Sequence, residues 1–185
     1  MADIVLETER LILRQFGEGD VELHARYLNS PEIMKHIGGV RELHEIEAKQ
    51  AKSTAGFARE GFGFMLLIEK ASGEPVGQAG MKRVDNPLAP NTGMHEIGWA
   101  IRPDRWRRGY AGEAVAAIIE WAFTRHGVPE LVALTSLSNE ASWRLMEKFG
   151  MARREDLDFD DPAYEPDDSP VIQYSLTQEQ WENSQ

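Results

Sequence analysis

The turn RWRRGYAGEA, residues 105–114, has the composition of an anion-binding site. It follows an apolar strand-like segment and opens a helix-like pattern, and three of its residues are small enough for a ligand to approach the backbone: Gly109, Ala111 and Gly112. Amides and the dipole at the start of a helix attract anions, and Arg107 and Arg108 add positive charge. The turn lacks both G-x-x-x-x-G-K-[ST] and G-x-G-x-x-G. We therefore expect a pyrophosphate site. The alternative is an ordinary helix start with solvated arginines.

A second segment, 136–151, places a hydroxyl on an otherwise apolar helix face. Asn139 is a candidate N-cap. The residues that share the face are spaced i, i+3, i+4 and i+7: Ser142, Leu145, Met146 and Phe149. The alternative is a small serine at the edge of the core, bonded to its own helix backbone.

A third candidate is the pair His95-Glu96, in the strand that precedes the arginine turn. A carboxylate beside a binding turn can act as a general base. The alternative is a cross-strand charge pair or a solvated strand face. The remaining histidines have no metal-ligand spacing, so we expect no metal site: His24, His36, His44 and His126.

The elements that position these residues follow from the hydrophobic period. The sequence predicts strands near 10–16, 62–70, 75–84, 94–101, 131–137, 151–155 and 171–176. It predicts helices at 20–28, 31–36, 42–59, 110–125 and 139–149, with Asp20 able to cap the first and Gly150 the last. This order is typical of an α+β or mixed sheet with helices on its faces. Without repeats or linkers, we expect a single domain over 1–185.

Composition excludes several classes of protein. Among 185 residues there is no cysteine, which rules out disulfides, cysteine-ligated zinc and a catalytic thiol. No segment approaches the roughly 20 apolar residues of a membrane-spanning helix, and the acidic N-terminal segment does not resemble a signal peptide. We expect a cytoplasmic protein without membrane attachment. The net charge of −11 argues against nucleic-acid binding.

Charge is distributed unevenly along the chain. Residues 155–168 carry eight acids and no base, whereas 102–108 carry four arginines and one aspartate. A basic cluster in an acidic protein favours a local anionic ligand over a polyanion.

Four stretches, in this order, resemble the GNAT acetyltransferases, which use acetyl-CoA. They are Thr8-Glu9-Arg10-Leu11-x-Leu13-Arg14, Glu96-Ile97-Gly98-Trp99-x-Ile101, Trp106-x-x-Gly109-Tyr110-Ala111-x-Glu113-Ala114, and Asn139-x-x-Ser142 through Glu147-Lys148-x-Gly150-Met151. They are most similar to the branch that includes the ribosomal-protein N-terminal (Ala and Ser) acetyltransferases. The resemblance covers nearly the whole chain.

The resemblance implies a mostly antiparallel twisted sheet of about six to seven strands with helices on both faces. The sheet would splay between its fourth and fifth strands, here 94–101 and 131–137. The pantetheine arm would pair with the backbone around Trp99, Ala100 and Ile101. The pyrophosphate would lie on the segment from Arg107 through Arg108, Gly109, Tyr110 and Ala111 to Gly112, and Asn139 would also contact the cofactor.

The sequence departs from the family pattern at two positions. The general GNAT loop begins with Gln or Arg where this chain has Trp106, but tryptophan is common in the N-terminal-acetyltransferase branch. Many GNAT enzymes use a tyrosine as general acid where this chain has Met146, which cannot donate a proton. In this branch a serine one turn earlier is thought to replace it, and that position matches Ser142.

The implied reaction is direct acetyl transfer to an amine. Glu96 would remove the amine proton, directly or through water, Ser142 would protonate the leaving thiolate, and a backbone amide of the fourth strand would hold the oxyanion. We expect a peptide or small-molecule amine as acceptor. A cationic acceptor is favoured if the acidic segment lines the acceptor cleft; the alternative is a solvated, mobile loop.

Two other functions stay open at this stage. One is a non-catalytic acyl-CoA-binding or regulatory module, which Met146 in place of tyrosine would allow. The other is nucleotide-phosphate binding by the arginine turn alone, which the missing Walker lysine disfavours. A homodimer is a further expectation, because exposed C-terminal strands could pair.

Overall fold

The computed structural model describes residues 2–184, which form two compact units. Among the described residues, the first unit comprises 2–82 and 99–118, and the second comprises 83–98 and 119–184. The chain passes from one unit to the other within β4 (Pro75–Arg83), β5 (His95–Ile101) and α4 (Tyr110–His126).

The strands of the first unit pair in the order β1-β2-β3-β4-β5. β1 (Ile4–Glu7), β2 (Leu11–Arg14) and β3 (Phe64–Glu69) are antiparallel to one another, and β3 is antiparallel to β4. The predicted strands at 10–16, 62–70 and 75–84 are confirmed with shorter bounds. The tight β3–β4 turn needs Gly73, whose φ is 72°.

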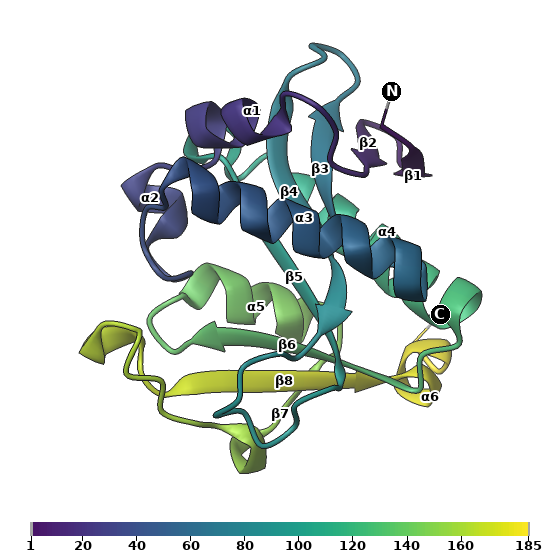
Figure 1. Cartoon of the computed structure of the whole chain (residues 1–185). Coiled ribbons are helices and arrows are strands. Elements are labelled where there is room, and N and C mark those ends of the chain that lie inside the picture. Colours follow the sequence, from purple (N-terminus) through teal and green to yellow (C-terminus); the bar gives the residue numbers. More distant parts are fainter. Residues whose placement is uncertain (1, 185) are drawn as a thin grey trace. The chain divides into compact units, whose positions relative to one another are not determined.

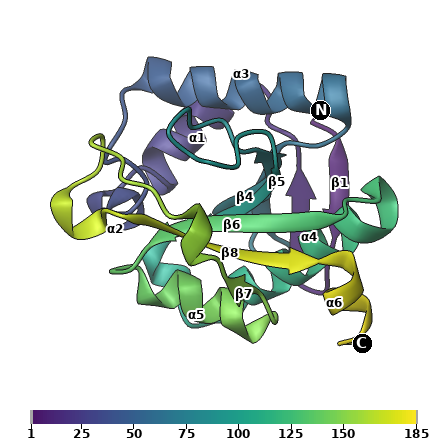
Figure 2. The same cartoon turned by 90° about the horizontal axis from the view of Figure 1, so that it is seen from below.

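Three helices lie in the first unit: α1 (Asp20–Tyr27), α2 (Pro31–Met34) and α3 (Leu43–Glu60). α3 begins with a capping box between Glu42 and Glu45. α1 contacts α3, and α3 lies along one side of β3 and β4 (Figure 1; Figure 2). One hydrophobic cluster of this unit consists of Leu28, Ile33, Met34 and Leu66, with half-buried neighbours that include Ala100 of β5.

Asp20 does not occupy the predicted capping position. Gly19 is the N-cap of α1, in a left-handed conformation that glycine favours. The buried Asp20 carboxylate instead accepts from the two terminal guanidinium nitrogens of Arg14, at 2.6 and 2.8 Å, and from the Gly17 amide. This acid therefore joins β2 to the start of α1.

The second unit has the strand order β5-β6-β8-β7. β6 (Glu130–Ser136) is antiparallel to β8 (Val171–Thr177) along all seven residues, and β8 pairs with the short β7 (Ala152–Arg153). α5 (Glu140–Lys148) contacts β6, and α6 (Gln178–Glu182) follows β8 (Figure 2). The parallel β5–β6 ladder comprises only two residue pairs, His95 with Leu131 and Glu96 with Val132.

The acidic segment between β7 and β8 is packed into the second unit. It contains two short 3-10 turns, η2 (Glu155–Leu157) and η3 (Pro166–Asp168). Phe159 packs against a cluster of Val84, Ala89 and Val132, and Asp161 and Asp168 are buried. The alternative of a merely solvated loop therefore does not hold for these residues.

The fold is the expected mixed α/β arrangement around a mostly antiparallel, open sheet. It has eight strands rather than six or seven, because β1 extends the sheet at one edge. The helix predicted for 31–36 is confined to Pro31–Met34, and α6 was not predicted. Within residues 2–184, no helix combines the length and apolar character needed to cross a bilayer.

Candidate active site

The arginine turn has a backbone shape suited to an anion. Arg107 has a φ of 60° and Gly109 a φ of 84°, so two residues of this short loop are left-handed. The first amide bonded within α4 is that of Glu113, which donates to the Gly109 carbonyl at 3.0 Å. The amides before it belong to the first helical turn, which has no intrahelical acceptors for them. These amides and the helix dipole favour a negatively charged ligand.

The four arginines around this turn divide into two pairs. Arg102 bridges to Asp104 at 2.8 Å and to Glu74 at 3.4 Å, and Arg105 bridges to Glu74 at 3.0 Å. Their charges are therefore balanced by neighbouring acids. Arg107 and Arg108 are exposed, and neither side chain makes an ion pair with any residue in 2–184. The positive charge left for a ligand belongs to this second pair.

Tyr110, the first residue of α4, can contact a ligand only through its backbone. Its ring is buried, and its hydroxyl donates a short hydrogen bond to Glu69 of β3. That hydrogen bond and burial raise the pKa of the Tyr110 hydroxyl, while hydrogen bonds from Ser72 and Tyr110 lower the pKa of Glu69. The hydroxyl is therefore a fixed structural donor. Ala111 and Gly112 follow, half-buried, in the same turn.

The end of β5 presents alternating backbone groups to its two edges. The Arg102 amide donates to the Val76 carbonyl of β4 at 2.9 Å. Because strand residues alternate, the backbone groups of Ile101 and Trp99 point to the opposite edge, whereas those of Ala100 point toward β4. The Ile101 carbonyl accepts from the Trp106 indole at 2.6 Å. Of the three predicted residues, Trp99 thus offers both an amide and a carbonyl at the edge away from β4.

In the second unit, α5 presents the predicted serine. Asn139 is the N-cap, and its side chain makes no capping hydrogen bond, so the cap rests on its backbone. Its carbonyl accepts from the Ser142 amide at 3.1 Å. Ser142 is half-buried, and no hydrogen bond of its hydroxyl is found within residues 2–184. Met146, one turn later, is buried in the core.

Glu96 lies on β5 and is half-buried. Its neighbour Ile97 is buried, so the two side chains alternate between a covered and a partly exposed face. The backbone of Glu96 forms the last pair of the β5–β6 ladder, opposite Val132. This position fixes the carboxylate at the point where that ladder stops.

Sequence reasoning missed a polar cluster that borders α5. The buried Asp168 carboxylate accepts from the Ser136 hydroxyl at 2.7 Å, and it also accepts a short bond from Ser138. Ser136 ends β6, and Ser138 directly precedes Asn139. The acidic segment is thereby attached to the turn that leads into the Ser142 helix. No local pattern signals this contact, because the partners are about thirty residues apart.

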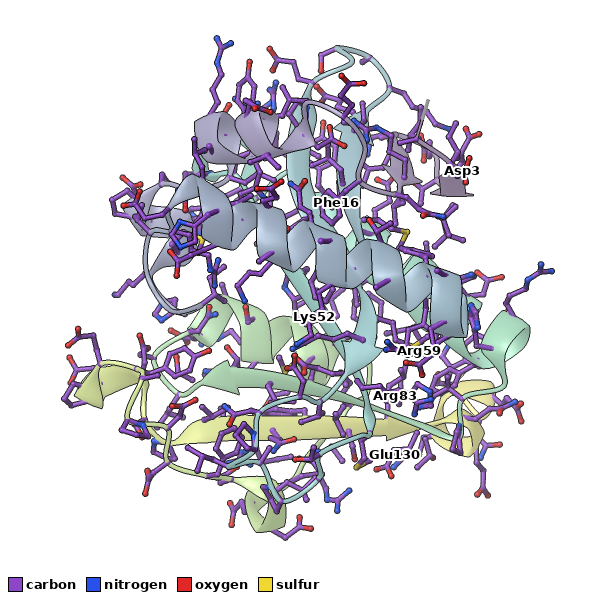
Figure 3. All side chains as sticks on the ribbon, in the orientation of Figure 1. Asp3, Phe16, Lys52, Arg59, Arg83 and Glu130 are labelled. Carbon is purple, nitrogen blue, oxygen red and sulfur yellow. The ribbon has the colours of Figure 1, made fainter. Side chains whose placement is uncertain are left out.

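The predicted site residues fall into two groups. The first unit contains Trp99, Ala100, Ile101 and the turn 107–112, and the second contains Glu96, Asn139 and Ser142. The first unit also has an open pocket of about 550 Å³ at residues 2–3 and 14–18, where Asp3 and Phe16 are labelled in Figure 3. That pocket includes no predicted site residue. Among residues 2–184, no group of histidine and acidic side chains could hold a metal ion.

Comparison with known proteins identifies the family. The family described as "Acetyltransferase (GNAT) domain" matches residues 10–152. The uncharacterised N-acetyltransferase YoaA of Bacillus subtilis is 30% identical over 152 residues, which is 80% of this chain and 83% of YoaA. The FsC-acetyl coenzyme A-N(2)-transacetylase of Aspergillus fumigatus is 30% identical over 186 residues, with 97% and 79% of the two chains covered.

A solved structure supports the same assignment. The acetyltransferase from Agrobacterium tumefaciens is 28% identical, with a TM-score of 0.75 and 95% of each chain covered. Together with the arginine turn at the start of α4 and the mostly antiparallel open sheet, these matches show that the chain is an acetyltransferase that belongs to the GNAT family.

Proposed function

We propose that this protein is an acetyl-CoA-dependent N-acetyltransferase that transfers acetyl directly to a primary amine. The observation that carries the proposal is the turn at 107–112, where two unpaired arginines and two left-handed residues precede the first turn of α4. A GNAT fold with such a turn is suited to a thioester cosubstrate that carries a pyrophosphate.

The residues of the first unit fit the two polar parts of acetyl-CoA. Arg107 and Arg108 supply charge, and the amides from Gly109 to Gly112 supply donors, which suits a pyrophosphate. At β5, the amide and carbonyl of Trp99 suit the amide-containing pantetheine arm, because strand edges bind extended chains through backbone hydrogen bonds. In this proposal Ala100 and Ile101 shape that edge, and Asn139 contributes its side-chain amide.

The chain supplies an acid and a base for the transfer. Acetyl-CoA provides an activated acyl group: the nitrogen–carbon bond forms as the carbon–sulfur bond breaks. Glu96 accepts the proton that the amine loses, directly or through water. Ser142 donates a hydrogen bond or a proton to the departing sulfur, which Met146 cannot do. Holding both reactants in one site supplies a further large part of the rate.

For the acceptor, we propose a peptide N-terminus or a small-molecule amine. The branch of ribosomal-protein N-terminal acetyltransferases is favoured by Trp106 and Ser142. A ribosomal-protein-S5-alanine acetyltransferase from Vibrio fischeri has a TM-score of 0.77, but its 14% identity shows a shared fold alone. The exposed Asp160, Glu165 and Asp167 favour a cationic acceptor. We propose action in the cytoplasm, without nucleic acid or membrane, and a homodimer stays a prediction.

A thiol-release assay tests the proposal. Purified protein is mixed with acetyl-CoA and a panel of peptides that begin with Ala or Ser, together with polyamines and aminoglycosides. The same peptides with a blocked N-terminus serve as controls. Acceptor-dependent CoA release and an acetylated product in the mass spectrum are expected. Tight acetyl-CoA binding without release for any amine would instead support a non-catalytic acyl-CoA-binding module, which the buried Met146 keeps open.

A further inference from the structure

The β1–β2 turn of the first unit contributes to a partly buried hydrogen-bond cluster around Glu113 of α4. One oxygen of this carboxylate accepts from the Thr8 hydroxyl at 2.5 Å and from the Arg10 amide at 2.8 Å. The other accepts from Nε of Arg10 at 2.7 Å, and Nη2 lies at 2.7 Å. The Glu113 side chain is only 16% exposed. The Glu113 carboxylate thus connects the β1–β2 turn to α4, more than one hundred residues later in the chain.

The guanidinium of Arg10 also contacts the arginine turn. Its remaining terminal nitrogen, Nη1, donates to the Arg108 carbonyl at 2.9 Å. A Cβ on Gly109 would lie 3.3 Å from Nη2, and the guanidinium carbon is 4.6 Å from the centre of the Tyr110 ring. Arg10 therefore contacts three consecutive residues on one side of the loop.

Arg10 binds the peptide group that joins Arg108 to Gly109, and the two left-handed residues, Arg107 and Gly109, stand on either side of Arg108. A non-glycine residue in this conformation is strained, and it persists where its surroundings impose it. In a planar trans peptide, the carbonyl of residue 108 and the amide of residue 109 point in opposite directions. With the carbonyl bound to Arg10, the Gly109 amide must point away from Arg10.

We propose that Arg10 and Glu113 are positioning residues that fix the arginine turn so that the Gly109 amide faces the pyrophosphate of acetyl-CoA. This inference rests on the proposed function. Glu113, which accepts from the Thr8 hydroxyl, binds the Arg10 guanidinium, and Arg10 in turn donates to the Arg108 carbonyl. Charge alone does not explain this role, because Glu113 is a negative group in the first turn of the helix that is to bind an anion.

Two substitutions distinguish a positioning role from a purely electrostatic effect on acetyl-CoA binding. Glu113→Gln removes a negative charge near the anion site, so electrostatics alone predicts tighter binding of acetyl-CoA. Positioning predicts the reverse, because the amide nitrogen of glutamine cannot accept from Arg10. Arg10→Lys keeps the charge but loses the fork that contacts Glu113 and Arg108 together. We expect about tenfold weaker binding for each variant, equivalent to about 1.4 kcal/mol.

The experiment is calorimetric titration of the wild type and both variants with acetyl-CoA. Acetylpantetheine, which lacks the pyrophosphate, is titrated in parallel at high concentration. The matched controls are Glu120→Gln, an exposed acid on α4, and Arg59→Lys, an exposed arginine on α3 that is labelled in Figure 3. Thermal unfolding of each variant reports whether it folds, and Thr8→Val provides a milder loss of one hydrogen bond to Glu113 if either variant fails to fold.

Positioning predicts that both variants lose affinity for acetyl-CoA but not for acetylpantetheine, while the controls behave as the wild type. Wild-type affinity in the folded variants, or tighter binding by Glu113→Gln, would overturn the inference and leave the proposed function standing. An equal loss for both ligands would overturn it too, because it would show a general structural defect. Absence of acetyl-CoA binding by the wild type would instead overturn the proposed function itself.

Discussion

The indole nitrogen of Trp106 donates to the carbonyl oxygen of Ile101 at 2.6 Å. This bond joins the start of the arginine turn to the last residue of β5, so the two parts of the proposed acetyl-CoA site are held by one side chain. Half of the Trp106 surface is nevertheless exposed, at 49%, so burial of the ring is not its main contribution.

Trp106→Phe keeps an aromatic ring but removes the indole N–H donor together with one of the two fused rings. We expect about fivefold weaker acetyl-CoA binding, because a hydrogen bond of this kind contributes about 1 kcal/mol. Calorimetric titration measures the change, and the melting temperature should stay close to that of the wild type. Unchanged affinity would show that the turn keeps its place without this bond.

Ser142→Ala tests the proposed acid. We expect kcat to fall by about 100-fold with little change in the KM for acetyl-CoA, because a positioned acid acts on the transition state. The measurement is steady-state kinetics with an acceptor found in the amine panel. The exposed Ser184 on the chain after α6 provides a matched Ser184→Ala control. Full turnover in Ser142→Ala would remove this residue from the chemistry.

Asp168→Asn tests the attachment of the acidic segment. Both Ser136 and Ser138 donate to the same carboxylate oxygen, Oδ1. Asparagine replaces this charged acceptor by a neutral amide oxygen, which forms weaker hydrogen bonds. We expect the free energy of unfolding to fall by about 2 kcal/mol, with faster proteolysis between residues 155 and 170. The neighbouring Asp167 is exposed, and Asp167→Asn should change neither measurement. Equal behaviour of the two variants would contradict a structural role for Asp168.

His24 of α1 predicts a dependence of stability on pH. It is buried, and neither ring nitrogen has a hydrogen-bond partner within residues 2–184. Burial, together with the positive charge of Arg41, lowers its pKa from 6.5 to about 4. Between these values the unfolded chain binds a proton that the native protein does not. Stability therefore falls as the pH drops from 6.5 toward 4, by at most about 1.4 kcal/mol per pH unit from this residue.

Chemical denaturation at several pH values measures this slope. His24→Leu removes the titrating group and its unsatisfied nitrogens, so we expect a flatter slope over the same window. The exposed His44 of α3 gives the matched control His44→Gln, which should keep the wild-type slope. The same slope in the His24→Leu protein would assign the acid sensitivity to other groups.

Local patterns sufficed to predict most of the elements. The 3.6-residue period over 110–125 and the apolar run at 131–137 predicted α4 and β6 to within about a residue at most ends. α6 was not predicted, although the structure shows a capping box between Thr177 and Gln180 at its start. β1 had no comparable signal: it is four residues long and none of them is buried.

The candidate site was predictable where its chemistry is local and hidden where it depends on distant contacts. Gly109 was predicted only as a small residue that lets a ligand approach the backbone, and nothing in the sequence indicated that Arg107 shares its left-handed conformation. Likewise, the sequence did not indicate which two of the four arginines in residues 102–108 have their charges balanced by acids. The acids concerned are distant in sequence: Glu69 ends β3, and Glu74 lies in the turn that follows it. Arg10 and Glu113 both stood in family-like motifs, but their pairing across the chain needed the structure.

The most direct test of the central claim is acetyl-CoA binding to the wild type and to the double variant Arg107→Gly/Arg108→Gln, measured by calorimetry. Glycine relieves the left-handed strain at position 107, so the variant should fold with nearly unchanged stability. The account predicts a dissociation constant of about 1 μM for the wild type, corresponding to about −8 kcal/mol, and much weaker binding by the variant. Failure of the wild type to bind, or equal affinity of a folded double variant, would contradict the assignment of this turn to the cosubstrate.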